Sequence, residues 1–174
     1  MARGPLTYVP TQVFSIVREA VRHLLRRPVV GVCAVARSAD GRILLVRRAD
    51  TGGWCLPGGT LEWGETLRES LARELAEETG ARLLRLGRVT GIYSRPDRDP
   101  RFHAVTICVL ADVAEPIQGP KNTLEIREAK LFLARDIPYP LSMEMSGPLE
   151  DALRDEAAAV WELGNVVSVK GAAT

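Results

Sequence analysis

Three glutamates between residues 74 and 78 are the side chains of this sequence best suited to chemistry. Glu77 and Glu78 follow Glu74 by three and four residues, a spacing that places all three on one face of a helix. Three carboxylates so close together repel one another, so the arrangement does little for stability. Carboxylate oxygens are the ligands that hard cations such as Mg²⁺ prefer. The spacing therefore predicts a divalent-metal site on this helix face.

A glycine-rich turn, Leu56-Pro57-Gly58-Gly59, lies just before this helix. Because glycine has no Cβ, the turn can bring bare backbone close to the same metals or to a phosphate. Trp54 and Trp63 flank the turn, and each can either stack on a nucleobase or pack the turn against the protein. The segment is therefore a second part of the predicted site.

The residues from Gly59 to Ala81 follow a fixed pattern of spacing. They read Gly, five residues, Glu, seven residues, Arg-Glu-Leu, one residue, Glu-Glu, one residue, Gly-Ala. This resembles the Nudix box of the Nudix hydrolases, with Ala81 where the family usually has a larger aliphatic residue. The resemblance implies an α/β (α+β) fold, a Nudix-type α/β/α sandwich around a mixed sheet. It also implies Mg²⁺-dependent or Mn²⁺-dependent cleavage of a nucleoside diphosphate linked to another group.

The resemblance also assigns roles to individual residues of the box. It implies metal coordination and a catalytic role for the carboxylates, and adds one backbone carbonyl as a ligand, so that the metal set is Glu74, Glu77, Glu78 and Gly59. It pairs Glu65 with Arg73 in a structural role. The attacking water needs a base, and relatives often supply a later glutamate, for which the candidates are Glu125 and Glu128. The sequence does not rank these two, and either fits an exposed strand residue equally well.

The segment from Ser94 to His103 is the best indication of specificity. Its Arg-Asp-Pro-Arg sequence followed by His resembles a loop of Nudix ADP-ribose pyrophosphatases. Guanidinium groups match phosphate oxygens bidentately, although a cluster of charges that pair with one another is the competing interpretation. The candidate substrate-binding residues are Arg47, Trp54, Arg95, Arg98, Arg101 and His103. Arg48 is the alternative to Arg47, since both end the strand before the glycine-rich turn.

The favoured interpretation is a pyrophosphohydrolase of a nucleoside diphosphate sugar, with ADP-ribose as substrate and AMP and ribose 5-phosphate as products. One alternative is a (d)NTP or other nucleotide pyrophosphohydrolase. A second is a non-catalytic nucleotide-binding module, which the intact carboxylate set disfavours. An RNA-decapping enzyme is a weaker alternative, because the net charge is only +1 and nucleic-acid binders usually carry a basic excess.

Composition agrees with a single soluble domain in a reducing, cytoplasmic setting. The chain has 174 residues, and its three cysteines are widely spaced and odd in number, which fits neither a disulfide framework nor a zinc site. We expect no signal peptide, no membrane span and no membrane partner, because no apolar run is long enough. The expected partner is a small nucleotide.

Strand and helix patterns predict the elements that must position these residues. We expect strands at Val29–Arg37, Arg42–Arg48, Leu83–Tyr93, Ala104–Ala111 and Ile126–Leu133, and helices at Thr66–Thr79 and from Ser146 to about Leu163. Leu67, Leu71 and Leu75 form an apolar stripe on the first helix beside the carboxylate face.

An amphipathic helix is predicted at Thr11–Arg27, before the catalytic segment. It can pack on its own domain, contribute to a homodimer or lie on a membrane surface. We therefore divide the chain into an N-terminal helical extension at residues 1–28, a catalytic domain at 29–164 and a tail at 165–174.

Overall fold

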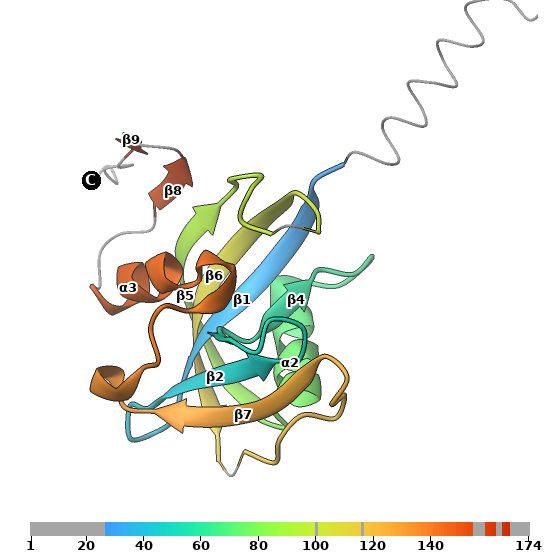
Figure 1. Ribbon diagram of the computed structural model, residues 1–174, viewed down its shortest axis with the longest axis vertical. Coiled ribbons are helices and arrows are strands. Elements are labelled where there is room, and N and C mark those ends of the chain that lie inside the picture. Colours follow the sequence, from blue (N-terminus) through green and yellow to red (C-terminus); the bar gives the residue numbers. More distant parts are fainter. Residues whose placement is uncertain (1–26, 100, 116, 155–158, 163–164, 168–174) are drawn as a thin grey trace, which may run out of the picture.

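A computed structural model describes residues 27–99, 101–115, 117–154, 159–162 and 165–167 (Figure 1). The predicted N-terminal helix lies outside these residues except for Arg27. No helix in the described part of the chain has the length and apolar character needed to cross a bilayer.

The centre of the fold is a mixed β-sheet, as expected. Its strands run in the order β3-β2-β1-β6-β5-β8-β9, with β4 paired to β1 and β7 paired to β2. Strand β1 runs parallel to β6 and antiparallel to β4, and β5 runs antiparallel to β6. The strands are β1 (Val29–Arg37), β2 (Ile43–Arg48), β3 (Trp54–Cys55), β4 (Gly58–Thr60), β5 (Arg82–Tyr93), β6 (Ala104–Ala114), β7 (Ile126–Phe132), β8 (Ala159–Glu162) and β9 (Asn165–Val167).

Helices α2 (Leu67–Glu78) and α3 (Ser146–Leu153) cover opposite faces of this sheet (Figure 1). Alternate residues of a strand point to opposite faces. On β1, Val32, Ala34 and Ala36 pack in one core with Leu71 and Leu75 of α2. The intervening Cys33 and Val35 pack in a second core with Leu149 and Ala152 of α3. The alternation along one strand thus builds the expected three-layer α/β/α sandwich.

Local signals set both ends of α2 within one residue of the prediction. Thr66 is the N-cap, and its side chain forms a reciprocal capping box with Glu69. Thr79 ends the helix, and Gly80 follows with φ +68°, a left-handed conformation that favours glycine. The next residue, Ala81, is buried in the core beside α2. The smaller side chain at this position is therefore accommodated inside the protein.

The predicted helix from Ser146 to about Leu163 is wrong beyond Leu153, where α3 ends. Residues Ala159–Glu162 instead form β8, which pairs in parallel with Gly91–Tyr93 of β5. Trp161 therefore lies on a strand, and Asn165–Val167 of the expected loose tail pairs with it as β9. The apolar spacing of this segment suits a helix, but the open edge of β5 supplies backbone partners that the local sequence does not reveal.

Candidate active site

A cavity of about 500 Å³ lies where β1 and β4 meet α2, bordered by loops around residues 50, 101 and 124. Its charged lining consists of Arg48, Asp50, Glu74, Glu78, Asp99, Arg101 and Glu125. Five carboxylates and two guanidinium groups leave an excess of negative charge. An anionic phosphate would be repelled from such a cavity unless cations neutralised part of that charge.

The carboxylate of Glu74 lines the cavity and lies against Gly59. A Cβ built on Gly59 would stand 2.2 Å from Oε1 of Glu74, so the carboxylate occupies the space that a side chain would fill. Nη1 of Arg73 donates to the same oxygen at 2.8 Å. Burial raises the pKa of Glu74 above its usual value despite this arginine. A second cationic partner would therefore stabilise the ionised form of this carboxylate.

Glu78 is a second, partly buried carboxylate of the cavity. Its Oε2 accepts a hydrogen bond from the backbone N–H of Gly58 at 2.9 Å. Burial is the main cause that raises its pKa to about 8, and nearby Glu74 and Glu125 raise it further. The ionised form therefore lacks sufficient positive charge nearby, which a bound cation would supply.

Glu77, the third carboxylate of the predicted metal set, does not line the cavity. Oε2 of Glu77 instead lies 3.6 Å from Nη1 of Arg73. Within the residues that the structure describes, no three His, Cys, Asp or Glu side chains converge into a complete metal site. Mg²⁺ in enzymes commonly uses one or two carboxylates and completes its shell with water and substrate phosphate. Glu74 and Glu78 fit that donor set in charge and in chemistry.

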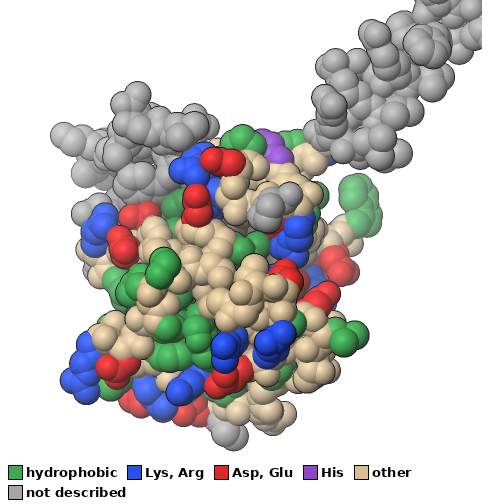
Figure 2. All heavy atoms as spheres, in the orientation of Figure 1, with side chains coloured by type: hydrophobic (Ala, Val, Ile, Leu, Met, Phe, Trp, Pro, Cys, Tyr) green, Lys and Arg blue, Asp and Glu red, His purple; other side chains and the backbone are tan. Residues whose placement is uncertain are grey.

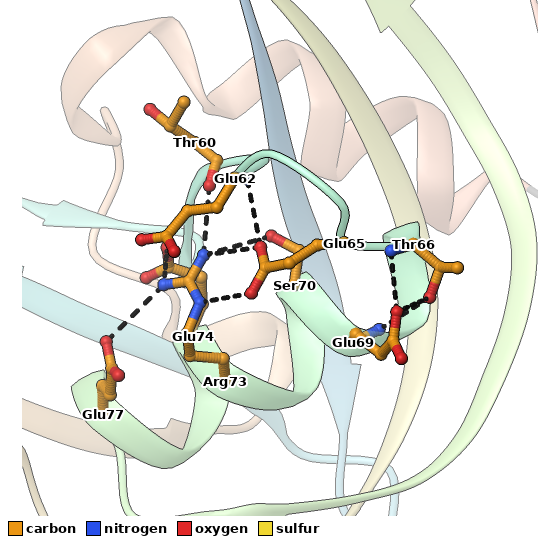
Figure 3. Close-up of polar contacts among 9 residues, drawn as sticks. All are labelled: Thr60, Glu62, Glu65, Thr66, Glu69, Ser70, Arg73, Glu74 and Glu77. Atoms are coloured by element: carbon orange, nitrogen blue, oxygen red, sulfur yellow. Dashed lines mark hydrogen bonds and ion pairs between the residues drawn. The ribbon is translucent and has the colours of Figure 1, made fainter.

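Arg73 connects helix α2 to the loop before it, which begins at Thr60 and contains Glu65 (Figure 3). Its Nε and Nη2 donate to the two carboxylate oxygens of Glu65 at 2.7 and 3.0 Å, the pairing that the resemblance implied. Nη2 also donates to the carbonyl oxygen of Thr60 at 3.1 Å. The remaining nitrogen holds Glu74, so a single guanidinium fixes both the loop and a cavity carboxylate.

Replacing Glu65 with glutamine should remove part of the acid dependence of stability. Arg73 is the main cause that lowers the pKa of Glu65 from 4.5 to about 2. Because the folded pKa is depressed, this pair stabilises the protein above pH 4.5 and is lost as the pH falls toward about 2. We expect Glu65→Gln to be less stable than the wild type at neutral pH. Between pH 4.5 and about 2 its unfolding free energy should fall less steeply than that of the wild type. Urea titrations at several pH values test this, with Glu62→Gln as control, since Glu62 contacts Glu65 through its backbone N–H and carbonyl groups, which the substitution leaves in place.

The structure separates the two candidate bases. Glu125 lines the cavity with Glu74 and Glu78. Glu128 lies on β7 opposite Arg47 of β2, is exposed, and does not line the cavity. Only Glu125 is therefore placed near the other carboxylates.

The arginines predicted to bind substrate also separate. Arg101 lines the cavity. Arg95 instead pairs with Asp97 and Glu144, and the guanidinium of Arg98 lies 4.9 Å from the centre of the Tyr93 ring. These two and His103, whose Nε2 lies 2.8 Å from the carbonyl oxygen of Ser94, are not part of the cavity wall.

On β2, Arg48 lines the cavity, whereas the predicted Arg47 does not. Nε of Arg47 donates to the carbonyl oxygen of Gly52, and its side chain is exposed. Strand parity is the signal that could have distinguished them, because Leu44 packs against the α2 side and Arg48 shares its face. Sequence reasoning left Arg48 open as the alternative to Arg47 and included Asp99 in the specificity loop without a role of its own. It missed Asp50.

Trp54 and Trp63 do not line the cavity, but other apolar side chains do. Trp54 packs edge-on against Phe132 with ring centres 4.9 Å apart, and Trp63 is fully exposed. Phe102 and Leu124 line the cavity while remaining 40% and 88% exposed. An exposed apolar surface beside the charges can take the flat face of a base or another apolar group.

On the face shown in Figure 2, positive and negative side chains are interspersed, with no continuous patch of one sign. Binding of a nucleic-acid backbone usually relies on a basic patch or stripe. This face therefore offers no such surface, which agrees with the net charge of +1.

Comparisons with known proteins agree with this geometry. A family model described as "NUDIX domain" matches residues 26–152. The chain is 36% identical over 135 residues to an ADP-ribose pyrophosphatase of Methanocaldococcus jannaschii, covering 75% of this chain and 76% of that protein. It is 48% identical over 69 residues to a MutT-like protein of Streptomyces ambofaciens, covering 40% of this chain and 44% of that protein.

Solved structures give the same result. A MutT NUDIX hydrolase of Burkholderia pseudomallei superposes with TM-score 0.63 at 29% identity, covering 72% of this chain and 98% of that chain. An ADP-ribose pyrophosphatase of Streptococcus suis superposes with TM-score 0.59 at 25% identity, covering 77% and 98%.

Proposed function

The chain belongs to the Nudix family, and from this premise we propose that it hydrolyses the pyrophosphate bond of a nucleoside diphosphate linked to a sugar. One observation carries the proposal: a single cavity combines partly buried carboxylates, two guanidinium groups and exposed apolar side chains. These suit, in turn, a divalent cation, a diphosphate and a nucleobase.

We propose that Glu74 and Glu78 hold Mg²⁺ or Mn²⁺, with Glu77 and the Gly59 carbonyl as further ligands. A divalent cation in this position would neutralise phosphate oxygens and acidify water. To Glu125, which lines the same cavity, we assign the role of orienting the attacking water and accepting its proton. Water attacks one phosphorus atom, the P–O bond to the bridging oxygen breaks, and the second phosphate leaves with that oxygen.

ADP-ribose is the substrate we favour, with AMP and ribose 5-phosphate as products. Support comes from the relative named as an ADP-ribose pyrophosphatase and from the loop at residues 94–103, which delivers Arg101 to the cavity. A small nucleotide has the charge and size for a cavity of about 500 Å³.

A screen of substrates tests this assignment. We expect kcat/KM in Mg²⁺ to be higher for ADP-ribose than for (d)NTPs, because a second ribose offers hydroxyls beyond the diphosphate. By similarity to the relative named as an ADP-ribose pyrophosphatase, we expect it also to be higher than for other nucleotide sugars or dinucleoside polyphosphates. A preference for a (d)NTP would favour the alternative pyrophosphohydrolase. Absence of hydrolysis of every compound would favour the non-catalytic module.

We propose further that residues 29–164 form the catalytic domain, that 1–28 are a helical extension, and that 165–174 are a tail. In this proposal the extension contributes to a homodimer, because its apolar stripe needs a surface to cover it. Light scattering of the full chain, and of a chain that begins at Val29, tests the dimer: a monomeric full chain at micromolar concentration contradicts it. The three buried free cysteines agree with a cytoplasmic location.

A further inference from the structure

Two arginines of the cavity are each held by an aspartate two residues away. Nε and Nη2 of Arg48 donate to the two oxygens of Asp50 at 2.8 and 2.6 Å. Nε and Nη2 of Arg101 donate to those of Asp99 at 2.9 and 2.7 Å. All four residues line the cavity that contains Glu74 and Glu78.

Each aspartate binds the edge of its guanidinium formed by Nε and Nη2. The opposite edge, which includes Nη1, is left for a ligand. A guanidinium carries five N–H donors, and this geometry uses the Nε–H and one on Nη2. In the described part of the chain no acceptor is recorded for Nη1 of Arg48 or of Arg101. Two such edges in one cavity match a ligand with two neighbouring phosphoryl groups.

The two pairs also lie within electrostatic range of each other. Arg48 is the main cause that lowers the pKa of Asp50 to about 2, and Arg101 contributes. Arg101 is the main cause that lowers the pKa of Asp99, and Arg48 contributes. The arginines thus stand close enough to repel each other, and the aspartates counter that repulsion.

We infer that Asp50 and Asp99 are positioning residues that hold Arg48 and Arg101 as a paired clamp for the diphosphate of the substrate. The inference rests on the proposed function for the identity of that substrate. The aspartates touch no phosphate themselves and act through the guanidinium groups. Asp99 is buried and also accepts the backbone N–H of Arg101 at 2.9 Å, so it fixes both the main chain and the side chain of that residue.

The charge of the aspartates makes the test decisive. Removing a negative charge near an anion strengthens its binding if only through-space repulsion matters. If the aspartate positions an arginine, its removal weakens binding instead. The two explanations therefore predict effects of opposite sign.

The probe is methylene diphosphonate, a diphosphate that water does not cleave, titrated calorimetrically into the full chain with Mg²⁺. We expect Asp50→Asn and Asp99→Asn each to raise the Kd about tenfold, as expected for weakened charge-assisted hydrogen bonds. The matched control is Asp40→Asn, because Asp40 holds Arg42 two residues on in a similar pair outside the cavity. That variant should leave the Kd unchanged.

A double-mutant cycle checks that Asp99 acts through Arg101. Arg101→Ala should weaken binding, and adding Asp99→Asn should weaken it no further. Additive losses, or tighter binding by the two asparagine variants, would overturn the inference. If Asp99→Asn fails to fold, Asp50→Asn decides alone, since Asp50 is exposed.

The calorimetric readout separates this inference from the proposed function. Wild-type protein that binds the diphosphonate but does not hydrolyse ADP-ribose would refute the substrate and leave the clamp standing. The clamp alone would be refuted if the wild type hydrolysed ADP-ribose and Asp50→Asn and Asp99→Asn both left the Kd for the diphosphonate unchanged.

Discussion

Replacing Glu78 with glutamine is expected to lower kcat by at least ~10²-fold, equivalent to about 2.7 kcal/mol of barrier. Glutamine keeps the shape of the side chain but removes the charge that would hold the cation. Glu78 lies in the cavity on α2, beside Glu74 and near Glu125, so no other group can take its position without moving. Steady-state kinetics across a range of Mg²⁺ concentrations measures the loss.

Glu69→Gln is the matched control, since it makes the same change on the same helix. Glu69 belongs to the capping box and lies outside the cavity, and glutamine can preserve its hydrogen bond to the N-cap. We expect kcat/KM to stay within about twofold of the wild type. Full activity of Glu78→Gln at limiting Mg²⁺ would contradict the metal assignment.

Metal binding and stability give readouts that do not depend on turnover. Calorimetric titration with Mn²⁺ should show weaker binding by Glu78→Gln than by Glu69→Gln. In a chelating buffer the unfolding free energy of Glu78→Gln should equal or exceed that of the wild type, because the substitution removes a carboxyl group whose charged form is disfavoured by burial and by the nearby Glu74 and Glu125. A large loss of stability would mean that Glu78 has a structural role instead.

Replacing Gly58 with alanine is expected to destabilise the protein by about 3 kcal/mol or more. A Cβ at this position would stand 2.2 Å from the carbonyl oxygen of Val32 and 2.6 Å from Cα of Cys33. Both atoms belong to the backbone of β1, which is paired on both sides and cannot move away. Gly58 also has φ +155°, where a side chain adds strain. Denaturant unfolding monitored by tryptophan fluorescence measures the effect.

Two other glycines show what the substitution does without a backbone clash. Gly147 of α3 has nothing within 4 Å of a built Cβ, so Gly147→Ala should be neutral or stabilising by up to about 1 kcal/mol. Gly59→Ala meets the carboxylate of Glu74, which can rotate away. We expect this variant to lose activity more than stability, and equal stability of all three variants would contradict the predicted order.

The sequence alone determined helix α2 and the spacing of the carboxylates along it. The capping box of Thr66 and Glu69, the apolar stripe of Leu71 and Leu75 and the glycine at residue 80 are local signals, and each acts within a few residues. The carboxylates at residues 74 and 78 follow from the same helical spacing. Strands β1, β2, β5, β6 and β7 were predicted within a few residues because their β-branched runs are bounded by turns.

Only the tertiary structure decided which charged residues meet in the cavity. Arg48 enters because strand parity and the position of α2 select one face of β2, and Arg101 enters while Arg95 and Arg98 find partners elsewhere. Asp50 belongs to no motif, and the Arg-Asp-Pro-Arg sequence that contains Asp99 does not reveal that this aspartate holds Arg101. The end of α3 and the strand β8 likewise depend on the open edge of β5, far away in the sequence. These choices rest on contacts between distant segments, whose energies no local pattern contains.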